Sequence, residues 1–420
     1  MYLKRHSSLK ISVGAEKKPY SYPMRQTQVL NLASSLKGGA GIAARRTHES
    51  LVEAGLDSYL LALKSEDSLE DPRIKKIRNS QISDFLSKAN TVLQRKFLQN
   101  SNRLVTPISI GTLAYRDFES YNPDVIHVHA YYNLLSTRQL WKIGQQFPKS
   151  RICVTLHDER LFTGGCHYTG GCNQFEKQCN NCPQVSRLGK FLVQKSHDLS
   201  LEEKCENYRI ITPSLWLAKQ VRRSSVLKRN PISTLMNPVP QIFFDQYHKE
   251  RKQSDFNIAF ISQNLDNPYK GIKTVIEAIA KLDLLVPLGK IIMNFVGRGE
   301  VSLETRNIKV NSTSIDSEKK MAEFLGKMNL VVLASTEDNL PNVILESLAA
   351  GTRVIGTNIG GIKEVLDGFN LDVYQPGDSQ ALSHLILKEF NSKFQKPNAL
   401  STLKFHYSEV SKRLLEIYSI

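Results

Sequence analysis

Short apolar runs alternate with helix-length amphipathic stretches along most of this 420-residue chain. That alternation is typical of parallel βα units. It occurs in two series, one beginning at Val29 and the other near Phe256. The segment Asn230–Asp245 between them is interrupted by prolines, as a linker would be. The pattern therefore predicts an α/β fold of two doubly wound, Rossmann-like domains, with ligands bound in the cleft where the two sheets face each other.

The individual elements can be placed from their apolar patterns and their ends. In the first series we expect strands Val29–Ala33, Tyr59–Leu63, Asp124–Ala130 and Arg151–His157, with a helix running through Ala54 and closed by Gly55. In the second series we expect strands Ile258–Ser262, Ile291–Val296, Leu330–Ala334 and Arg353–Gly356, with helices Ile272–Leu282 and Val343–Ala350. The last helix, Ser401–Tyr418, has no clear strand after it and is expected to pack back onto the first half.

These elements divide the chain into four parts. We expect a basic flexible tail at 1–26, a first Rossmann-like domain at 27–235 with a cysteine-rich insert at 164–184, a second Rossmann-like domain at 236–400 and a final helix at 401–420. With 41% hydrophobic and 23% charged residues, the composition is globular rather than fibrous or disordered.

Charge and hydropathy bear on partners and location. The chain has 56 basic and 40 acidic residues, a net charge of +16 that favours nucleotide phosphates, anionic lipid headgroups or nucleic acid. The tail is either a solvated segment or an anchor on an anionic membrane surface. No segment approaches the roughly 20 apolar residues of a membrane span. We therefore expect a cytoplasmic protein, with contact at the inner face of the membrane as a further option.

The most informative stretch is Ala334–Gly361, reading ASTEDNLPNVILESLAAGTRVIGTNIGG. Pro341 suits the first turn of a helix. The free N–H groups of Asn342 and Val343, with the helix dipole behind them, form an anion site suited to a diphosphate. Two turns on, Glu346 offers two carboxylate oxygens that can accept both hydroxyls of a ribose. Gly360 and Gly361, at the end of the stretch, let backbone approach a ligand closely.

This stretch resembles the donor-binding signature of the family-4 retaining glycosyltransferases, which have the GT-B fold. The family motif is two glutamates separated by seven residues, and here Asp338 and Glu346 occupy the two positions. The resemblance implies that Glu346 holds the nucleotide ribose and that Asp338 lies near the transferred sugar. Asp338 is one methylene shorter than the usual glutamate, and Glu337 stands beside it as a fallback.

Other segments resemble family landmarks in the right order. Lys270-Gly271 resembles the pair whose lysine meets the donor diphosphate, although the arginine that usually precedes it is absent here, so Arg298 or another basic residue must help. Gly38–Gly41 resembles the N-domain loop near the diphosphate and acceptor. The resemblance thus implies a set of donor-binding residues: Gly39, Gly41, Lys270, Arg298, Asn339, Leu340, Glu346 and Gly361.

Two histidines end the buried strands of the first domain. His129 is the better match to the family histidine that touches the donor sugar, and His157 is the second candidate, near the acceptor. The alternative for either is a structural hydrogen bond. With Asp338 they form the candidate catalytic set.

The resemblance also implies how the reaction proceeds. Metal-dependent transferases of the GT-A fold use an Asp-x-Asp motif, and this sequence contains none. Helix amides and Lys270 would stabilise the leaving nucleoside diphosphate instead, so no catalytic cofactor is expected. The leaving phosphate would take the proton of the acceptor hydroxyl. The donor would be a UDP- or GDP-sugar.

Four cysteines crowd into the insert, at Cys166, Cys172, Cys179 and Cys182. Only Cys179-x2-Cys182 matches the usual zinc-binding arm, so a structural zinc and free cysteines in a packed loop both remain open. The insert resembles that of bacterial exopolysaccharide transferases of the colanic-acid type. That likeness implies a glycan or lipid-linked saccharide acceptor.

Other classes of protein remain as alternatives. An epimerase or phosphorylase of the GT-B fold would share the cleft, but an epimerase lacks this pairing of Lys-Gly with the spaced carboxylates and a phosphorylase needs a far longer chain. An inactive GT-B scaffold is suggested by the substituted Asp338 and the missing arginine. A basic, zinc-containing binding protein would need clustered basic residues, and here they are dispersed, which makes nucleic acid an unlikely partner.

Overall fold

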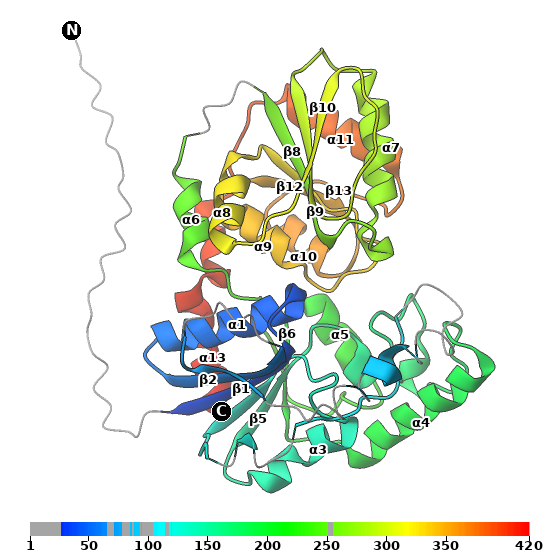
Figure 1. The fold of residues 1–420 in the computed structure, drawn as a ribbon, viewed down its shortest axis with the longest axis vertical. Helices are drawn as coiled ribbons and strands as arrows, with labels where there is room; N and C mark the ends of the chain where they lie inside the picture. The colour runs from blue at the N-terminus through cyan, green and yellow to red at the C-terminus, as the bar shows by residue number, and fades with distance from the viewer. Residues whose placement is uncertain are drawn as a thin grey trace.

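The computed structural model describes residues 27–64, 71–77, 85, 88–92, 94, 104–113, 117–118, 120–250 and 255–419. The basic tail expected at 1–26 lies outside these residues. The described chain forms two lobes, each built around one parallel sheet (Figure 1).

The N-terminal sheet has seven parallel strands in the order β3-β2-β1-β4-β5-β6-β7. Their bounds are β1 Gln28–Ser35, β2 Asp57–Lys64, β3 Ile74–Lys76, β4 Val125–Val128, β5 Arg151–Thr155, β6 Arg209–Thr212 and β7 Ile232–Thr234. The order reverses between β1 and β4, which makes the carboxyl ends of these two strands the expected ligand-binding edge.

The C-terminal sheet repeats the plan with six strands in the order β10-β9-β8-β11-β12-β13. Their bounds are β8 Phe256–Asn264, β9 Ile291–Arg298, β10 Ile308–Thr313, β11 Leu330–Val332, β12 Arg353–Thr357 and β13 Val373–Tyr374. Here the order reverses between β8 and β11. The segments that follow these two strands carry Lys270 and Asp338.

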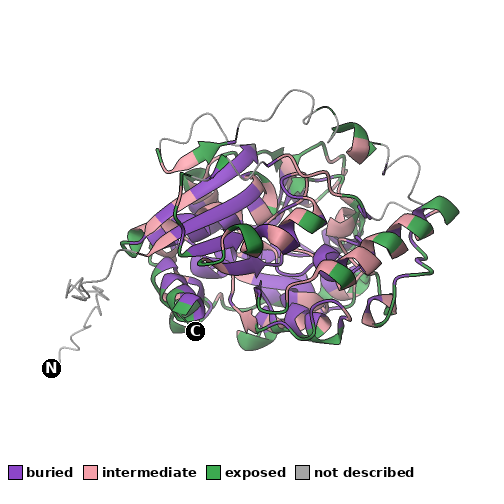
Figure 2. Ribbon diagram, turned by 90° about the horizontal axis from the view of Figure 1, so that it is seen from below, coloured by how far each residue is buried: buried purple, intermediate pink, exposed green. Residues whose placement is uncertain are grey.

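Helices cover both faces of each sheet. In the N-terminal half they are α1 Gly38–Glu53, α3 Thr137–Gln146, α4 Arg187–Glu203 and α5 Leu215–Arg223. In the C-terminal half they are α6 Gln241–Tyr247, α7 Ile272–Asp283, α8 Glu318–Lys327, α9 Asn342–Ala349, α10 Gly360–Gly368, α11 Ser379–Asn391, α12 Ala399–Thr402 and α13 Tyr407–Ser419. The central strands are therefore buried on both faces, as Figure 2 shows, which explains their continuous apolar sequences.

The last helix, α13, returns to the N-terminal lobe and packs beside α1 (Figure 1). Its apolar side chains join one core cluster with residues of β1 and β4, namely Val410, Leu414, Ile417 and Tyr418 with Val29 and Val125. Helix α13 is thus part of the hydrophobic core of the N-terminal lobe.

The expected linker Asn230–Asp245 is more structured than its prolines suggested. It contains the edge strand β7 and most of helix α6. Pro240 is the N-cap residue of α6, a position where its missing N–H removes no helical hydrogen bond. Short, half-buried strands such as β7 and β10 carry no continuous apolar run, which is why the pattern did not show them.

Candidate active site

The glycine-rich loop after β1 leads directly into α1 and lies against the C-terminal lobe. Gly38 has φ +77°, and a Cβ on Gly41 would stand 2.4 Å from the carbonyl oxygen of Ser35, so both positions favour glycine. A Cβ on Gly39 would meet nothing within 4 Å. The carbonyl oxygen of Gly39 accepts a 3.0 Å hydrogen bond from the side chain of Asn342 at the start of α9. The predicted N-domain loop therefore meets the predicted diphosphate site.

Helix α9 begins at Asn342, one residue earlier than the expected start at Val343. Pro341 is its N-cap residue. Asn342 and Val343, the first two helical residues, are half-buried. Their N–H groups have no acceptor within the helix, because the first turn of any helix leaves its N–H groups unpaired in that way. The start of α9, next to Gly39, therefore has the unpaired N–H groups that an anion-binding site needs.

Lys270 and Asp338 meet where the C-terminal sheet reverses its strand order. Lys270 Nζ lies 2.6 Å from Asp338 Oδ2, and the hydroxyl of Ser335 donates to the same oxygen at 3.3 Å. Gly271 has φ +68°, and a Cβ there would stand 1.9 Å from the carbonyl oxygen of Ala334. Glycine is therefore required at position 271, because the backbone there packs closely against the segment that follows β11.

Glu346 is buried and forms an ion pair that the sequence did not reveal. Its Oε1 lies 2.7 Å from Nη2 of Arg46, on α1 of the other lobe. Arg46 also pairs with Glu318 at 2.6 Å. Burial raises the pKa of Glu346 and outweighs the opposing effect of Arg46, while the two arginines Arg45 and Arg46 overcome the burial of Glu318 and lower its pKa. The predicted ribose-binding carboxylate thus contacts an arginine across the domain boundary.

Three further donor-site candidates have mainly structural contacts. Asn339 is buried and accepts a 2.8 Å hydrogen bond from Ser214 of the N-terminal lobe. Leu340 packs in the core of the C-terminal lobe. The N–H of Gly361 donates to the carbonyl of Asn339, and a Cβ on Gly361 would stand 2.0 Å from that oxygen. The close backbone approach expected at Gly360-Gly361 is therefore made to Asp338 and Asn339.

Arg298, proposed to replace the missing arginine, is exposed at the end of β9. Its Nε donates to the carbonyl of Gln263 at 3.5 Å. Gly297 before it has φ +155°, and a Cβ there would stand 1.9 Å from the carbonyl of Ser262. Arg298 thus lies beside the end of β8, at the same end of the sheet as the segment that carries Lys270.

The histidines at the ends of β4 and β5 come together with a third histidine. His157 Nε2 lies 3.4 Å from His129 Nδ1, and the rings of His127 and His129 are 4.1 Å apart. Burial lowers the pKa of His127 to about 3 and that of His157 to about 4, and it lowers the pKa of His129 well below its usual value. All three rings are neutral at pH 7 and can both donate and accept hydrogen bonds.

The hydrogen-bond partners of His127 and His129 differ. His127 is satisfied by Tyr418 and Thr155, each at 2.7 Å, so its role is structural. Among the described residues, nothing stands within hydrogen-bond distance of Nε2 of His129. Within the described part of the chain this ring nitrogen of His129 is therefore unpaired, and it is buried rather than open to solvent. His127 and His129 alternate along one strand and so share a face, a signal that would have identified His127 as well.

Beyond β5 lies a group of buried side chains in which the sequence prediction included Asp158, next to His157, but not Glu159. Burial, with Glu337 and Asp158 nearby, raises the pKa of Glu159 to about 7. Asp158 is paired with His167 at 3.0 Å, and although burial opposes it, Arg160 and His167 hold the pKa of Asp158 well below its usual range. Polar residues directly after a buried strand were the available signal for these groups.

The cysteine-rich insert reaches the cleft through Tyr168. The ring of Tyr168 lies 5.2 Å from that of Tyr269, next to Lys270. The hydroxyl of Tyr269 in turn accepts a 2.7 Å hydrogen bond from the backbone of Leu104. The insert and the C-terminal lobe therefore form one wall.

The four insert cysteines are free thiols that line one small cavity. In the part of the chain that the structure describes, no three His, Cys, Asp or Glu side chains are arranged so that they hold a metal ion as they lie.

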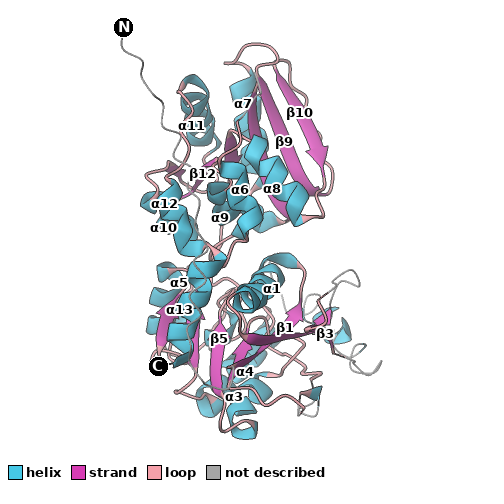
Figure 3. Ribbon diagram, turned by 90° about the vertical axis from the view of Figure 1, so that its left-hand side faces the viewer, coloured by secondary structure: helices cyan, strands magenta, loops and turns pink. Residues whose placement is uncertain are grey.

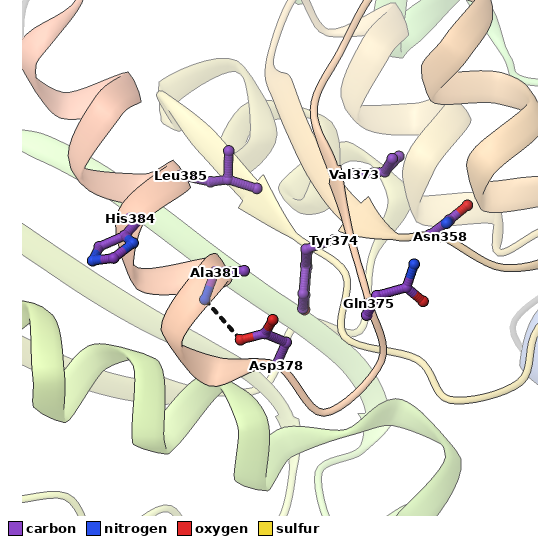
Figure 4. A pocket seen from close by; sticks show the side chains of 8 residues that line it. All are labelled: Asn358, Val373, Tyr374, Gln375, Asp378, Ala381, His384 and Leu385. Carbon is purple, nitrogen blue, oxygen red and sulfur yellow. Dashed lines mark hydrogen bonds between the residues drawn. The ribbon is translucent and has the colours of Figure 1, made fainter.

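Another cavity lies elsewhere, on the C-terminal lobe. It has a volume of about 440 Å³ and lies between β13 and α11, where Asp378 caps the helix by accepting from Ala381 (Figure 4). Its lining includes Asn358, Tyr374 and His384. None of the predicted site residues lines it.

Comparison with known proteins agrees with this arrangement. Residues 255–391, which span the C-terminal sheet, match the family model described as glycosyl transferases group 1. Escherichia coli WcaC, named as a colanic acid biosynthesis glycosyl transferase, is 23% identical over 358 residues, 79% of this chain and 82% of that protein. An uncharacterized glycosyltransferase of Methanocaldococcus jannaschii is 27% identical over 347 residues, 75% of this chain and 93% of that protein.

Solved structures show the same fold at low identity. A glycosyltransferase from Rickettsia africae superposes with a TM-score of 0.60 at 15% identity, covering 94% of this chain and 98% of that one. Anabaena HepE in complex with UDP-glucose gives 0.60 at 15% identity, covering 94% of this chain and all of the other. The fold is therefore GT-B, as predicted.

Proposed function

We propose that this chain is a retaining glycosyltransferase of family 4 that moves a sugar from a nucleoside-diphosphate sugar to a glycan or lipid-linked saccharide, in the synthesis of a cell-surface polysaccharide. The observation that carries the proposal is the ion pair of Lys270 with Asp338, a few residues before α9, the helix that contacts the Gly39 loop through Asn342 and carries Glu346. The matched C-terminal domain, the UDP-glucose bound by HepE and the colanic-acid name of WcaC support it.

In this proposal the donor replaces the ion pair of Lys270 with Asp338 and binds beside the pair of Arg46 with Glu346. The diphosphate lies at the N–H groups of Asn342 and Val343 and draws Lys270 from Asp338. The ribose hydroxyls donate to Glu346, which Arg46 holds in place with a charged hydrogen bond. Arg298, at the end of β9, adds positive charge near the diphosphate.

Catalysis then depends on charge stabilisation and positioning. The bond between the sugar C1 and the phosphate oxygen breaks, the acceptor oxygen bonds to C1 on the same face, and its proton passes to the leaving phosphate. Helix amides and Lys270 stabilise the charge that develops on that phosphate, which is the role a metal ion has in other transferases. His129 donates to the transferred sugar from the opposite lobe, Asp338 lies beside that sugar, and His157 lines the acceptor side.

The proposed acceptor places the enzyme at the cytoplasmic face of a membrane. The net charge of +16 suits an anionic surface. Among the described residues, every helix is too short or too polar to cross a bilayer. We therefore propose peripheral contact.

Donor binding is tested by thermal unfolding of the full chain with UDP- and GDP-sugars, each with and without EDTA. The matching donor should raise the melting temperature by a few degrees, with or without EDTA. Glu346→Gln, which keeps the side-chain volume, should abolish the rise, whereas Glu277→Ala on the exposed face of α7 should preserve it. If no nucleotide sugar changes the melting temperature, the proposal is wrong.

The reaction itself is tested by following donor hydrolysis or transfer by proton NMR. A product with the anomeric configuration of the donor supports retention, and the opposite configuration excludes it. Donor binding without any turnover on saccharide acceptors would indicate an inactive GT-B scaffold.

A further inference from the structure

Four thiols from different turns of the insert surround one cavity in the N-terminal lobe. Cys166, Cys172, Cys179 and Cys182 line it, together with Phe175 and Val193. Cys166, Cys179 and Cys182 are at most 6% exposed. The cavity holds about 10 Å³, which is close to the space needed by one water molecule or one ion.

The four thiols also lie near one another. Each of Cys172, Cys179 and Cys182 lies near enough to Cys166 to affect its pKa, and all four thiols line the same small cavity. The two other cysteines of the chain lie elsewhere: Cys153 is in the core beneath α13, and Cys205 is beyond the end of α4. The clustering is therefore particular to the insert.

The insert has little regular structure to hold it. Between Thr163 and Ser186 its one helical turn is the 3-10 helix Gln174–Glu176. A few side-chain hydrogen bonds order the rest, such as those from Gln184 to the carbonyls of Tyr168 and Thr169. Phe175 and three of the cysteines join the core of the N-terminal lobe, but the loop has little regular structure, and a metal ion can stabilise a segment of this kind.

We infer that these four cysteines bind one zinc ion. In structural sites zinc is bound tetrahedrally by four cysteine or histidine ligands, four cysteines among the common sets, and Cys179-x2-Cys182 supplies the usual chelating arm. The thiols are not at ligand distances as they lie. A rotation about χ1 moves a cysteine sulfur without moving the backbone, so the ion can draw them together. Each thiol releases its proton on binding. A cavity of this size suits one ion rather than an iron–sulfur cluster.

The ion would act on the acceptor side of the cleft. Cys166 continues directly into His167, which bonds to Thr106 at 2.8 Å and to Asp158 at 3.0 Å. The next residue, Tyr168, packs against Tyr269 of the C-terminal lobe. Zinc therefore fixes the wall that follows β5, while the donor site of the C-terminal lobe does not depend on it.

The first test is metal content of the full chain, purified from zinc-supplemented cells without chelators and measured by inductively coupled plasma mass spectrometry. We expect about one zinc per chain in the wild type and in Cys205→Ser, and less than about a tenth of that in Cys179→Ser/Cys182→Ser. A wild type without zinc, or an equal loss in Cys205→Ser, overturns the inference, as does iron with visible absorption.

A second test needs no variant. Titration of the native protein with a mercurial reagent in the presence of a zinc-sensitive dye should release one zinc as four thiols react. A strong chelator should lower the melting temperature, and zinc but not magnesium should restore it. Reaction of the thiols without zinc release contradicts the inference. Donor-induced stabilisation, measured on the same samples, reports separately on the proposed function.

Discussion

The contact between Arg46 and Glu346 shows how a single residue can link two distant parts of the chain. Arg46 is 1% exposed and pairs with both Glu346 and Glu318, while its guanidinium lies 5.3 Å from the ring of Phe243. Burying charges is costly, so the group is stable only when every charge keeps its partner. Removing Arg46 leaves Glu346 without a basic partner, whereas Glu318 still pairs with Arg45.

We therefore expect Arg46→Met to lower the free energy of unfolding by roughly 3–5 kcal/mol, since it leaves the buried carboxylate of Glu346 without a cation, while Glu318 keeps its pairing with Arg45. The double variant Arg46→Met/Glu346→Gln should recover part of this loss. Denaturant unfolding measures both, with Arg413→Met on the exposed face of α13 as the control. If Arg46→Met and the control unfold with equal free energies, the ion pairs of Arg46 do not contribute to stability.

Glu159 predicts a particular dependence of stability on pH. Its pKa is raised to about 7 in the folded protein, so the folded state holds a proton that the unfolded state loses near pH 4.5. Stability from this group is present below pH 4.5 and is lost as the pH rises through 7, by on the order of 3 kcal/mol.

The buried histidines act in the opposite sense, because their lowered pKa values make stability fall as the pH drops from about 6.5 toward 4. Comparison with Glu159→Gln separates the two effects. Relative to this variant, the wild type should lose melting temperature between pH 5 and 8. Parallel pH profiles for the two proteins would contradict the assignment.

At the scale of elements, the glycines at the start of α1 have two different roles. One is required by steric crowding, and the other leaves space that a ligand can occupy. Gly41 cannot carry a side chain, since its Cβ would overlap the carbonyl of Ser35, whereas a Cβ on Gly39 has no neighbour within 4 Å. Gly41→Ala should therefore cost about 1–3 kcal/mol. Gly39→Ala should leave the protein without donor as stable as before, because alanine suits a helix better than glycine.

In the proposed site the added methyl of Gly39→Ala would stand where the donor diphosphate approaches. Gly39→Ala should thus reduce the donor-induced rise in melting temperature, and thermal unfolding with and without the nucleotide sugar measures it. If the rise keeps its full size, the donor lies elsewhere.

How far the sequence predicted the structure differs between elements. Long apolar strands and the Lys270 and Glu346 segments were identified, because burial on both faces and helix-end chemistry leave a local pattern. The half-exposed strand β10 and the two-residue β13 leave none. Arg46 could not be predicted, because only the packed fold brings α1 against α8 and α9.

At the scale of the whole molecule, contacts between the lobes hold the cleft in one arrangement. Figure 3 shows α1 and α5 on the side of the N-terminal lobe that faces α9 and α10. Besides Arg46, the carboxylate of Glu364 on α10 accepts hydrogen bonds from the N–H groups of Leu215 and Trp216, both at 3.0 Å. A residue of one lobe thus caps a helix of the other.

That cap gives a way to loosen the lobes without touching the proposed donor site. In Glu364→Ala helix α5 keeps its own cap, since Ser214 accepts from Leu217, but loses the charged contact at its positive end, worth about 1 kcal/mol. The fraction of open molecules should rise, and the radius of gyration from small-angle X-ray scattering should increase. Lys363→Ala, whose side chain pairs with Asp367 on the exposed face of α10, is the matched control.

Tryptophan fluorescence gives an independent measure of the same opening. The chain has two tryptophans, and Trp141 is buried in the N-terminal core, so Trp141→Phe leaves Trp216 at the lobe boundary as the reporter. In this background Glu364→Ala should move the emission to longer wavelength, as the indole gains contact with water, and donor should reverse part of the change by favouring the closed form. Unchanged emission and scattering in Glu364→Ala would show that the remaining contacts, led by Arg46, hold the lobes together without this cap.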